Sequence, residues 1–251
     1  MIYLVFPTSW HPSQPYLSLP SLKAFLNMHG VHDVVQRDLA IELLNDLCTW
    51  EKTKPLYERI IRELNELSSR PRLTQPEAEK FNKLREAEEI VMALKDQIDS
   101  AVASQRSQEF YEIDQYMENL KIMDVWLDNI LAPYYPSQLT VIGSQMRFSP
   151  YSSEEVIDSF NHPEENFFYD LYQQWYLPGI LEEDIDILGI SITSVEQIIS
   201  GLTLAYLVKQ NRPEIHITIG GSVFTKLVDR LEKEGSHLFN FVDSFVVHEG
   251  E

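Results

Sequence analysis

Two short loops hold the residues whose types and spacing suit ligand binding. The first, Ser191-Ile192-Thr193-Ser194, is uncharged and rich in hydroxyl groups. The second, Gly220-Gly221-Ser222, lacks bulky side chains, so a ligand can approach its backbone closely. Hydroxyls and main-chain amides bind polar or anionic ligand groups, above all where a helix begins. The chemistry that these loops indicate is binding.

Predicted strands and a helix place the two loops at the same edge of a sheet. A β-branched apolar run over 185–192 predicts a strand covered on both faces, and a second run over 215–219 predicts another. Between them, the apolar spacing of Val195–Gln210 predicts a helix that ends before Pro213. Open parallel sheets bind ligands at the carboxyl ends of their strands, so both loops become candidate ligand walls.

The same residues also have a purely structural interpretation. Ser194 or Ser222 can cap a helix, and Gly221 can serve to turn the chain. The pairing of the two loops favours the ligand site. Under that interpretation, Gly221→Leu should obstruct the ligand and leave the fold intact.

The amino-terminal segment predicts a second βαβ unit. Ile2–Phe6 reads as a buried strand, and the loop after it carries Thr8 and Ser9. A helix from about Leu19 or Pro20 to Met28 and a strand over Val31–Asp38 follow. Near the other end, the pattern predicts a helix over 222–233 and a strand over 241–247.

These elements predict an α/β fold, with a Rossmann-like (flavodoxin-like) five-stranded parallel sheet of order 2-1-3-4-5. Residues 1–38 and 184–251 form this domain. Residues 39–183 form a large helical insertion between strands two and three, poor in glycine and patterned for two or three long antiparallel helices. Its aromatic segment, Phe167–Tyr176, is either a packed junction or a flat binding face.

Composition excludes several classes of function. Against 39 acidic residues stand 20 basic ones, and the net charge of −19 disfavours nucleic acids and anionic membrane surfaces. The single cysteine, Cys48, excludes a disulfide framework and any multi-cysteine metal centre within these residues, which favours a cytoplasmic setting. No stretch approaches the ~20 apolar residues that span a bilayer.

The run DIDILGISITSVEQIISGLTLAYLVKQNRPEIHITIGGSVFTKL, followed by FVDSFVVHEGE, resembles the amino-terminal cobalamin-binding domain of cobalamin-dependent radical S-adenosylmethionine proteins. The order and spacing of several motifs carry this resemblance. It covers about Met1–Asp38 and Asp184–Glu251, and it reaches the FSPYSSEEVIDSF segment.

The resemblance implies a cofactor site with no catalytic residue of its own. The corrin ring would face the loop after the first strand, the nucleotide tail would lie along the two loops described above, and an acidic turn would close the rim. The implied cofactor-binding residues are Thr8, Ser9, Ser191, Thr193, Ser194, Gly220, Gly221, Ser222, Glu249 and Gly250.

Two motifs found in related proteins are missing from this sequence. Without Asp-x-His-x-x-Gly, we expect cobalamin to be held base-off with no protein histidine on cobalt. Without C-x-x-x-C-x-x-C, the iron–sulfur cluster and S-adenosylmethionine would belong to a downstream radical domain in the same polypeptide. The resemblance thus implies the cobalamin-binding part of a larger radical-based or methyl-transferring enzyme.

Two other classes of function remain as alternatives. One is a cofactor-free, Rossmann-like sensor or protein-interaction module, which a stop codon shortly downstream would favour over a C-x-x-x-C-x-x-C motif. The other is a nucleotide-dependent hydrolase or transferase. It ranks last because neither G-x-x-x-x-G-K-[ST] nor G-x-G-x-x-G occurs, and no Ser/His/Asp grouping has elbow spacing.

Overall fold

The computed structural model describes residues 1–11, 14 and 16–248, which divide into two compact units. Met1–Ile41 and Phe148–Glu251 form the sheet unit, and Glu42–Arg147 form the helical unit. The second boundary therefore lies at Phe148 instead of the predicted residue 184. The reason is that the helices after Phe148 pack against the main helix of the sheet unit and so belong with the sheet.

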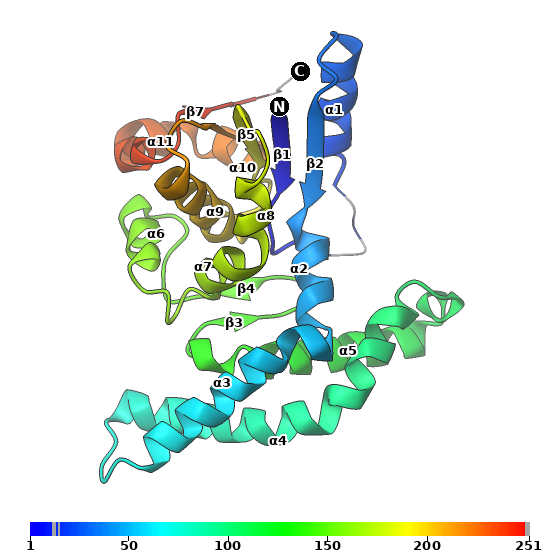
Figure 1. Ribbon diagram of the computed structural model, residues 1–251, viewed down its shortest axis with the longest axis vertical. Coiled ribbons are helices and arrows are strands. Elements are labelled where there is room, and N and C mark those ends of the chain that lie inside the picture. The colour runs from blue at the N-terminus through cyan, green and yellow to red at the C-terminus, as the bar shows by residue number, and fades with distance from the viewer. Residues whose placement is uncertain (12–13, 15, 249–251) are drawn as a thin grey trace. The chain divides into compact units, whose positions relative to one another are not determined.

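The sheet unit contains, among the described residues, five parallel strands in the order β2-β1-β5-β6-β7 (Figure 1). The strands β3 and β4 pair separately, so the strands of this sheet, counted along the chain, run 2-1-3-4-5. The predicted parallel sheet is confirmed, as is the pairing of the first strand with the strand after the insertion. The bounds are β1 Ile2–Phe6, β2 Val34–Asp38, β5 Ile187–Ser191, β6 His216–Gly220 and β7 Ser244–Phe245.

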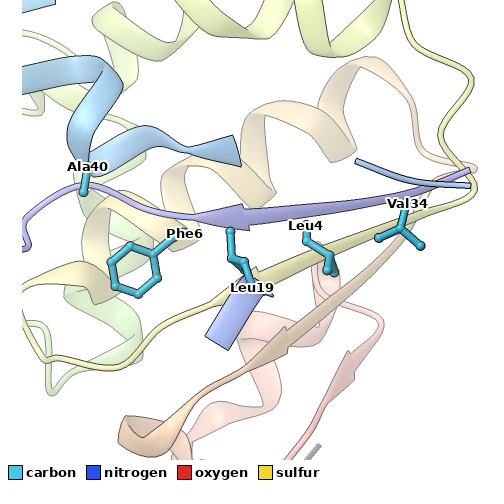
Figure 2. Packing of buried hydrophobic residues seen from close by; sticks show 5 residues of the cluster. All are labelled: Leu4, Phe6, Leu19, Val34 and Ala40. Atoms are coloured by element: carbon cyan, nitrogen blue, oxygen red, sulfur yellow. The ribbon is translucent and has the colours of Figure 1, made fainter. Parts of the chain in front are cut away.

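Apolar side chains on both faces of the central strands explain why these segments form a sheet. One face is wholly buried, with Tyr3, Val5, Leu188, Ile190, Ile217 and Ile219. On the other face, α1 (Ser18–Met28) packs against β1 and β2. Figure 2 shows the resulting cluster, which consists of Leu4, Phe6, Leu19, Val34 and Ala40.

The helices and strands of the sheet unit follow the predicted pattern with two differences. The predicted helix over 222–233 is broken at Leu227, whose φ of −102° and ψ of 12° are not helical. The predicted strand over 241–247 is only two residues long, because Phe241 and Val242 instead turn inward and are buried. The bounds are α6 Ser153–Phe160, α7 Phe167–Leu171, α8 Leu177–Leu181, α9 Gln197–Asn211, α10 Ser222–Lys226 and α11 Val228–Glu234.

The aromatic segment Phe167–Tyr176 packs against the main helix of the sheet unit, which agrees with the first of its two interpretations, a packed junction. Phe167, Phe168 and Tyr172 are fully buried, and α7 packs against α9. A π-helical turn over Tyr172–Tyr176 joins α7 to α8. Such turns are often found at functional sites, and this one directs the Tyr172 hydroxyl toward the loop after β1.

Three long helices build the helical unit, as the sequence predicts. Their facing sides bury Ile60, Leu84, Val91, Ile98, Trp126 and Leu127. The Trp126 indole donates a hydrogen bond of 2.6 Å to the Leu47 carbonyl. The helices are α3 Trp50–Ser68, α4 Gln75–Ser104 and α5 Ile113–Ile130, preceded by α2 Leu39–Leu47 and followed by the hairpin β3 Gln138–Leu139 and β4 Ser144–Gln145. None of the helices in the described ranges is both long enough and apolar enough to cross a membrane.

Cys48 is fully buried in the helical unit, and we predict that it is unreactive in the native protein. Burial raises the pKa of its thiol, and the nearby carboxylates of Asp124 and Asp99 raise it further. The nucleophilic thiolate is therefore scarce and inaccessible. When the protein is mixed with a chromogenic disulfide reagent, absorbance should show that no reporter thiolate is released without denaturant. In concentrated urea, one equivalent per chain should be released. Rapid native labelling would contradict this burial.

Candidate functional site

The sequence-predicted residues meet at the carboxyl edge of the sheet. The loops after β1, β5 and β6 are neighbours there because their strands are adjacent and parallel. Glu249 and Gly250 lie outside the described residues. The predicted residues that the structure brings to this edge are Thr8, Ser9, Ser191, Thr193, Ser194, Gly220, Gly221 and Ser222.

The β5 and β6 loops are joined directly through their backbones. The Ile192 amide donates to the Gly220 carbonyl at 2.8 Å, and the Ser222 hydroxyl donates to the Thr193 carbonyl at 3.1 Å. Gly221 has φ +112°, and a Cβ at this position would lie 2.0 Å from the Ile192 carbonyl oxygen. The expectation that Gly221→Leu leaves the fold intact is therefore wrong, since any side chain would force the loops apart.

Gln197 joins the β5 loop to the β1 loop. Its side-chain oxygen accepts from the Thr193 amide at 2.9 Å, the Thr193 hydroxyl at 3.0 Å and the Ser194 amide at 3.2 Å. Its side-chain nitrogen donates to the Pro7 carbonyl at 2.9 Å. Gln197 is fully buried, so these contacts are shielded from water. The Thr193 and Ser194 amides, which could face a ligand, are therefore bonded to the protein itself.

The sequence contains a signal for Gln197 that the loop-based prediction did not use. Ser194 and Gln197 have the S/T-x-x-E/Q spacing of a capping box, in which the later side chain reaches back to the backbone amide of the earlier residue, although α9 itself begins after Glu196. Gln197 makes that contact with Ser194. The Ser194 hydroxyl bonds instead to the Glu196 carboxylate at 2.7 Å, which places a negative charge beside the loop.

Thr8 holds the β1 loop from inside the protein. Its hydroxyl lies 2.8 Å from the Tyr172 hydroxyl, its amide donates weakly to the same oxygen at 3.4 Å, and its carbonyl accepts from Ser200 at 3.1 Å. Burial raises the pKa of Tyr172 to about 12, against the opposing effect of its bonds with Thr8 and Ser200. The phenol is therefore protonated at neutral pH. Thr8 anchors the loop here, in contrast to its expected role facing a ligand.

Past Thr8, the β1 loop changes direction and carries aromatic rings. Ser9 is nearly buried and has φ +74°, a left-handed conformation that is uncommon without glycine and is enriched at functional sites. The rings of Phe6, Trp10 and Tyr16 contact one another, with centroids 5.4–5.8 Å apart. Ser191 donates to the Ser18 hydroxyl at 2.9 Å and so ties the end of β5 to α1.

An apolar groove opens elsewhere in the sheet unit, and no predicted site residue lines it. Its walls come from α6, α9, α10 and α11, including Val156, Ile198, Phe224 and Leu231. Its interior of about 50 Å³ has room for only a few water molecules, whereas ligand pockets typically measure about 300–1,000 Å³. In this conformation the groove does not accommodate a nucleotide or a macrocycle.

No family model, curated protein or solved structure matches this chain. Within the described residues, no group of three or more His, Cys, Asp or Glu side chains is arranged to hold a metal ion.

Proposed function

We propose that the chain is a cobalamin-binding domain of Rossmann-like (flavodoxin-like) type that serves a larger radical S-adenosylmethionine enzyme. The observation that carries the proposal is the meeting of the hydroxyl-bearing loops after β1, β5 and β6 at one sheet edge. The chain order reverses between β1 and β5, and ligands of open α/β sheets bind where such a reversal occurs. A cytoplasmic location and a downstream radical domain that holds the iron–sulfur cluster belong to the same proposal.

The polar groups at this edge suit a nucleotide tail, but the bonded loops leave too little space for one. Thr193, Ser194 and Ser222 are at least partly exposed and offer hydroxyls, and Gly220 adds an accessible backbone. These groups would hold the ribose and phosphate of a base-off cobalamin. A bound cobalamin supplies cobalt-centred group transfer, while this chain supplies binding and orientation. Because Gln197 joins the β1 and β5 loops, the tail needs these two loops to separate.

An apolar surface beside the edge suits the corrin ring. Trp10 is partly exposed, Tyr16 is 38% exposed and Leu17 is 68% exposed, next to the hydroxyl-bearing loops. Aromatic rings that already contact one another offer a preformed support for a large planar ligand. This surface is the part of the edge that we assign to the macrocycle.

One observation favours a second candidate function, a cofactor-free sensor or interaction module. Gln197 satisfies the Thr193 and Ser194 amides without any ligand, so the edge is stable as a closed structure. A domain that has lost its cofactor would be expected to close its site in this way.

Titration of the chain with hydroxocobalamin, followed by its visible spectrum, tests the proposal. We expect a saturable spectral change that survives alanine substitution of each of the seven histidines. Ser222→Phe should raise the Kd about tenfold or more by blocking the edge, a loss of about 1.4 kcal/mol. Ser68→Phe, an equal change at an exposed position of the helical unit, should have no effect.

Three results would contradict parts of the proposal. No spectral change at about 1 mM cobalamin, the weakest affinity of practical interest, would favour the interaction module. Equal affinities for Ser222→Phe and the parent would place the ligand elsewhere. Loss of binding on one His→Ala change would show a histidine on cobalt.

A further inference from the structure

Two contacts between neighbouring loops, here called seams, lie at the candidate edge: one between the β5 and β6 loops and one between the β1 and β5 loops. They differ in how they are held. Between the β5 and β6 loops the contact is chiefly backbone to backbone, with Gly221 packed against Ile192, and the Ser222 hydroxyl adds a bond to the Thr193 carbonyl. Between the β1 and β5 loops, the bridge is the side chain of Gln197. A backbone seam of this kind cannot widen without breaking the sheet edge, whereas a side-chain bridge can be released by rotation about its χ angles.

The loops therefore form two blocks. Thr8 is fixed to Tyr172 and Ser200, which makes the β1 loop one block. The β5 loop is fixed to the β6 loop through Ile192 and Ser222, which makes the second block. Gln197 contacts both, with its oxygen on the second block and its nitrogen on the Pro7 carbonyl of the first.

We propose that Gln197 is a latch between these blocks and that a ligand enters the edge between the β1 and β5 loops by releasing it. The entry route rests on the proposed function, because it assumes that the edge binds cobalamin. The latch itself is a property of the chain without ligand. Gln197 is thus a positioning residue, and the β5–β6 seam is a fixed wall.

Substitution by glutamate separates the latch from simple helix capping. A carboxylate keeps the acceptor that serves Thr193 and Ser194, and negative charge is favourable at a helix start. It cannot donate to Pro7, and it places an oxygen against that carbonyl. If Gln197 only caps α9, then Gln197→Glu should leave amide exchange of the β1 loop unchanged. Gln210→Glu, at the exposed far end of α9, carries the same charge change and is the control.

Hydrogen exchange of the ligand-free chain tests the latch. In Gln197→Glu, amide exchange of the β1 loop around Thr8 and Ser9 should rise about tenfold, the effect of losing one hydrogen bond. Exchange at Thr193 and Ser194 should be unchanged, because their acceptor remains. Gln210→Glu should match the parent at both loops. Unchanged exchange of the β1 loop in Gln197→Glu would overturn the latch.

Cobalamin affinity tests the entry route, with an uncharged variant to avoid repulsion of the phosphate. Gln197→Met keeps a similar volume and removes the bridge, with retained folding checked by circular dichroism. If the ligand must release the latch, then the Kd for hydroxocobalamin should fall about tenfold, because the open state is more populated. A higher Kd would overturn the entry route. If the parent binds no cobalamin, the proposed function and the route both fail, and the exchange result alone decides the latch.

Discussion

Gly221→Ala is expected to lower the free energy of unfolding of the sheet unit by about 3 kcal/mol or more. Two independent effects add at this position. A Cβ would lie 2.0 Å from the oxygen and 2.6 Å from the carbonyl carbon of Ile192, and backbone atoms cannot move aside as a flexible side chain can. The φ of +112° is also one that side chains disfavour.

Two other glycines separate these effects. Gly30 has φ +85°, and a Cβ there would meet nothing within 4 Å, so Gly30→Ala carries the conformational cost alone, about 1 kcal/mol. Gly179 lies in α8 with no positive φ and no near neighbour, so Gly179→Ala should be neutral or stabilising by up to about 1 kcal/mol. Urea unfolding followed by circular dichroism measures all three. A Gly221→Ala protein as stable as Gly30→Ala would contradict the backbone contact.

The strands of the sheet could be predicted because their apolar runs encode burial locally. Ile2–Phe6 and the run before Ser191 read as strands from their own residues, and their pairing follows from the strand order expected for a doubly wound sheet. The short β7 could not be predicted in the same way. Phe241 and Val242 are as apolar as strand residues, but their side chains are buried outside the sheet pairing, which the sequence does not reveal.

The candidate site shows the same division between local and non-local information. The hydroxyl and glycine residues of the loops could be recognised in the sequence, and the strand order makes these loops neighbours. Their partners could not be predicted, because they come from distant segments: Thr8 bonds to Tyr172, 164 residues away, and Gln197 bonds to Pro7, 190 residues away. Such partners decide whether a polar residue faces a ligand or the interior. Thr8 therefore lies at the predicted edge, but its bonds to Tyr172 and Ser200 could not be predicted.

Tyr172→Phe is expected to destabilise the sheet unit by about 1–3 kcal/mol, because it leaves the buried Thr8 hydroxyl without the phenol as partner. Thr8→Val in the same protein should recover part of this loss, since the double variant no longer buries an unpaired Thr8 hydroxyl. Tyr111→Phe, at a residue 78% exposed, should have no effect. A double variant whose loss of stability equals the sum of the two single losses would show that the two hydroxyls do not depend on each other.

The pH dependence of the same variant follows from the raised pKa of Tyr172. Burial favours the neutral phenol, so the folded protein has a pKa of about 12 where an unfolded tyrosine has about 10. The stabilisation from this group is fully present below pH 10 and is lost as the pH rises toward 12. Other tyrosines titrate equally in parent and variant. The advantage of the parent over Tyr172→Phe should therefore shrink by about 1 kcal/mol between pH 10 and pH 11 in urea titrations. A constant gap across this range would mean that the Tyr172 hydroxyl ionises as freely in the folded chain as in the unfolded one, and that it does not anchor the β1 loop from the interior.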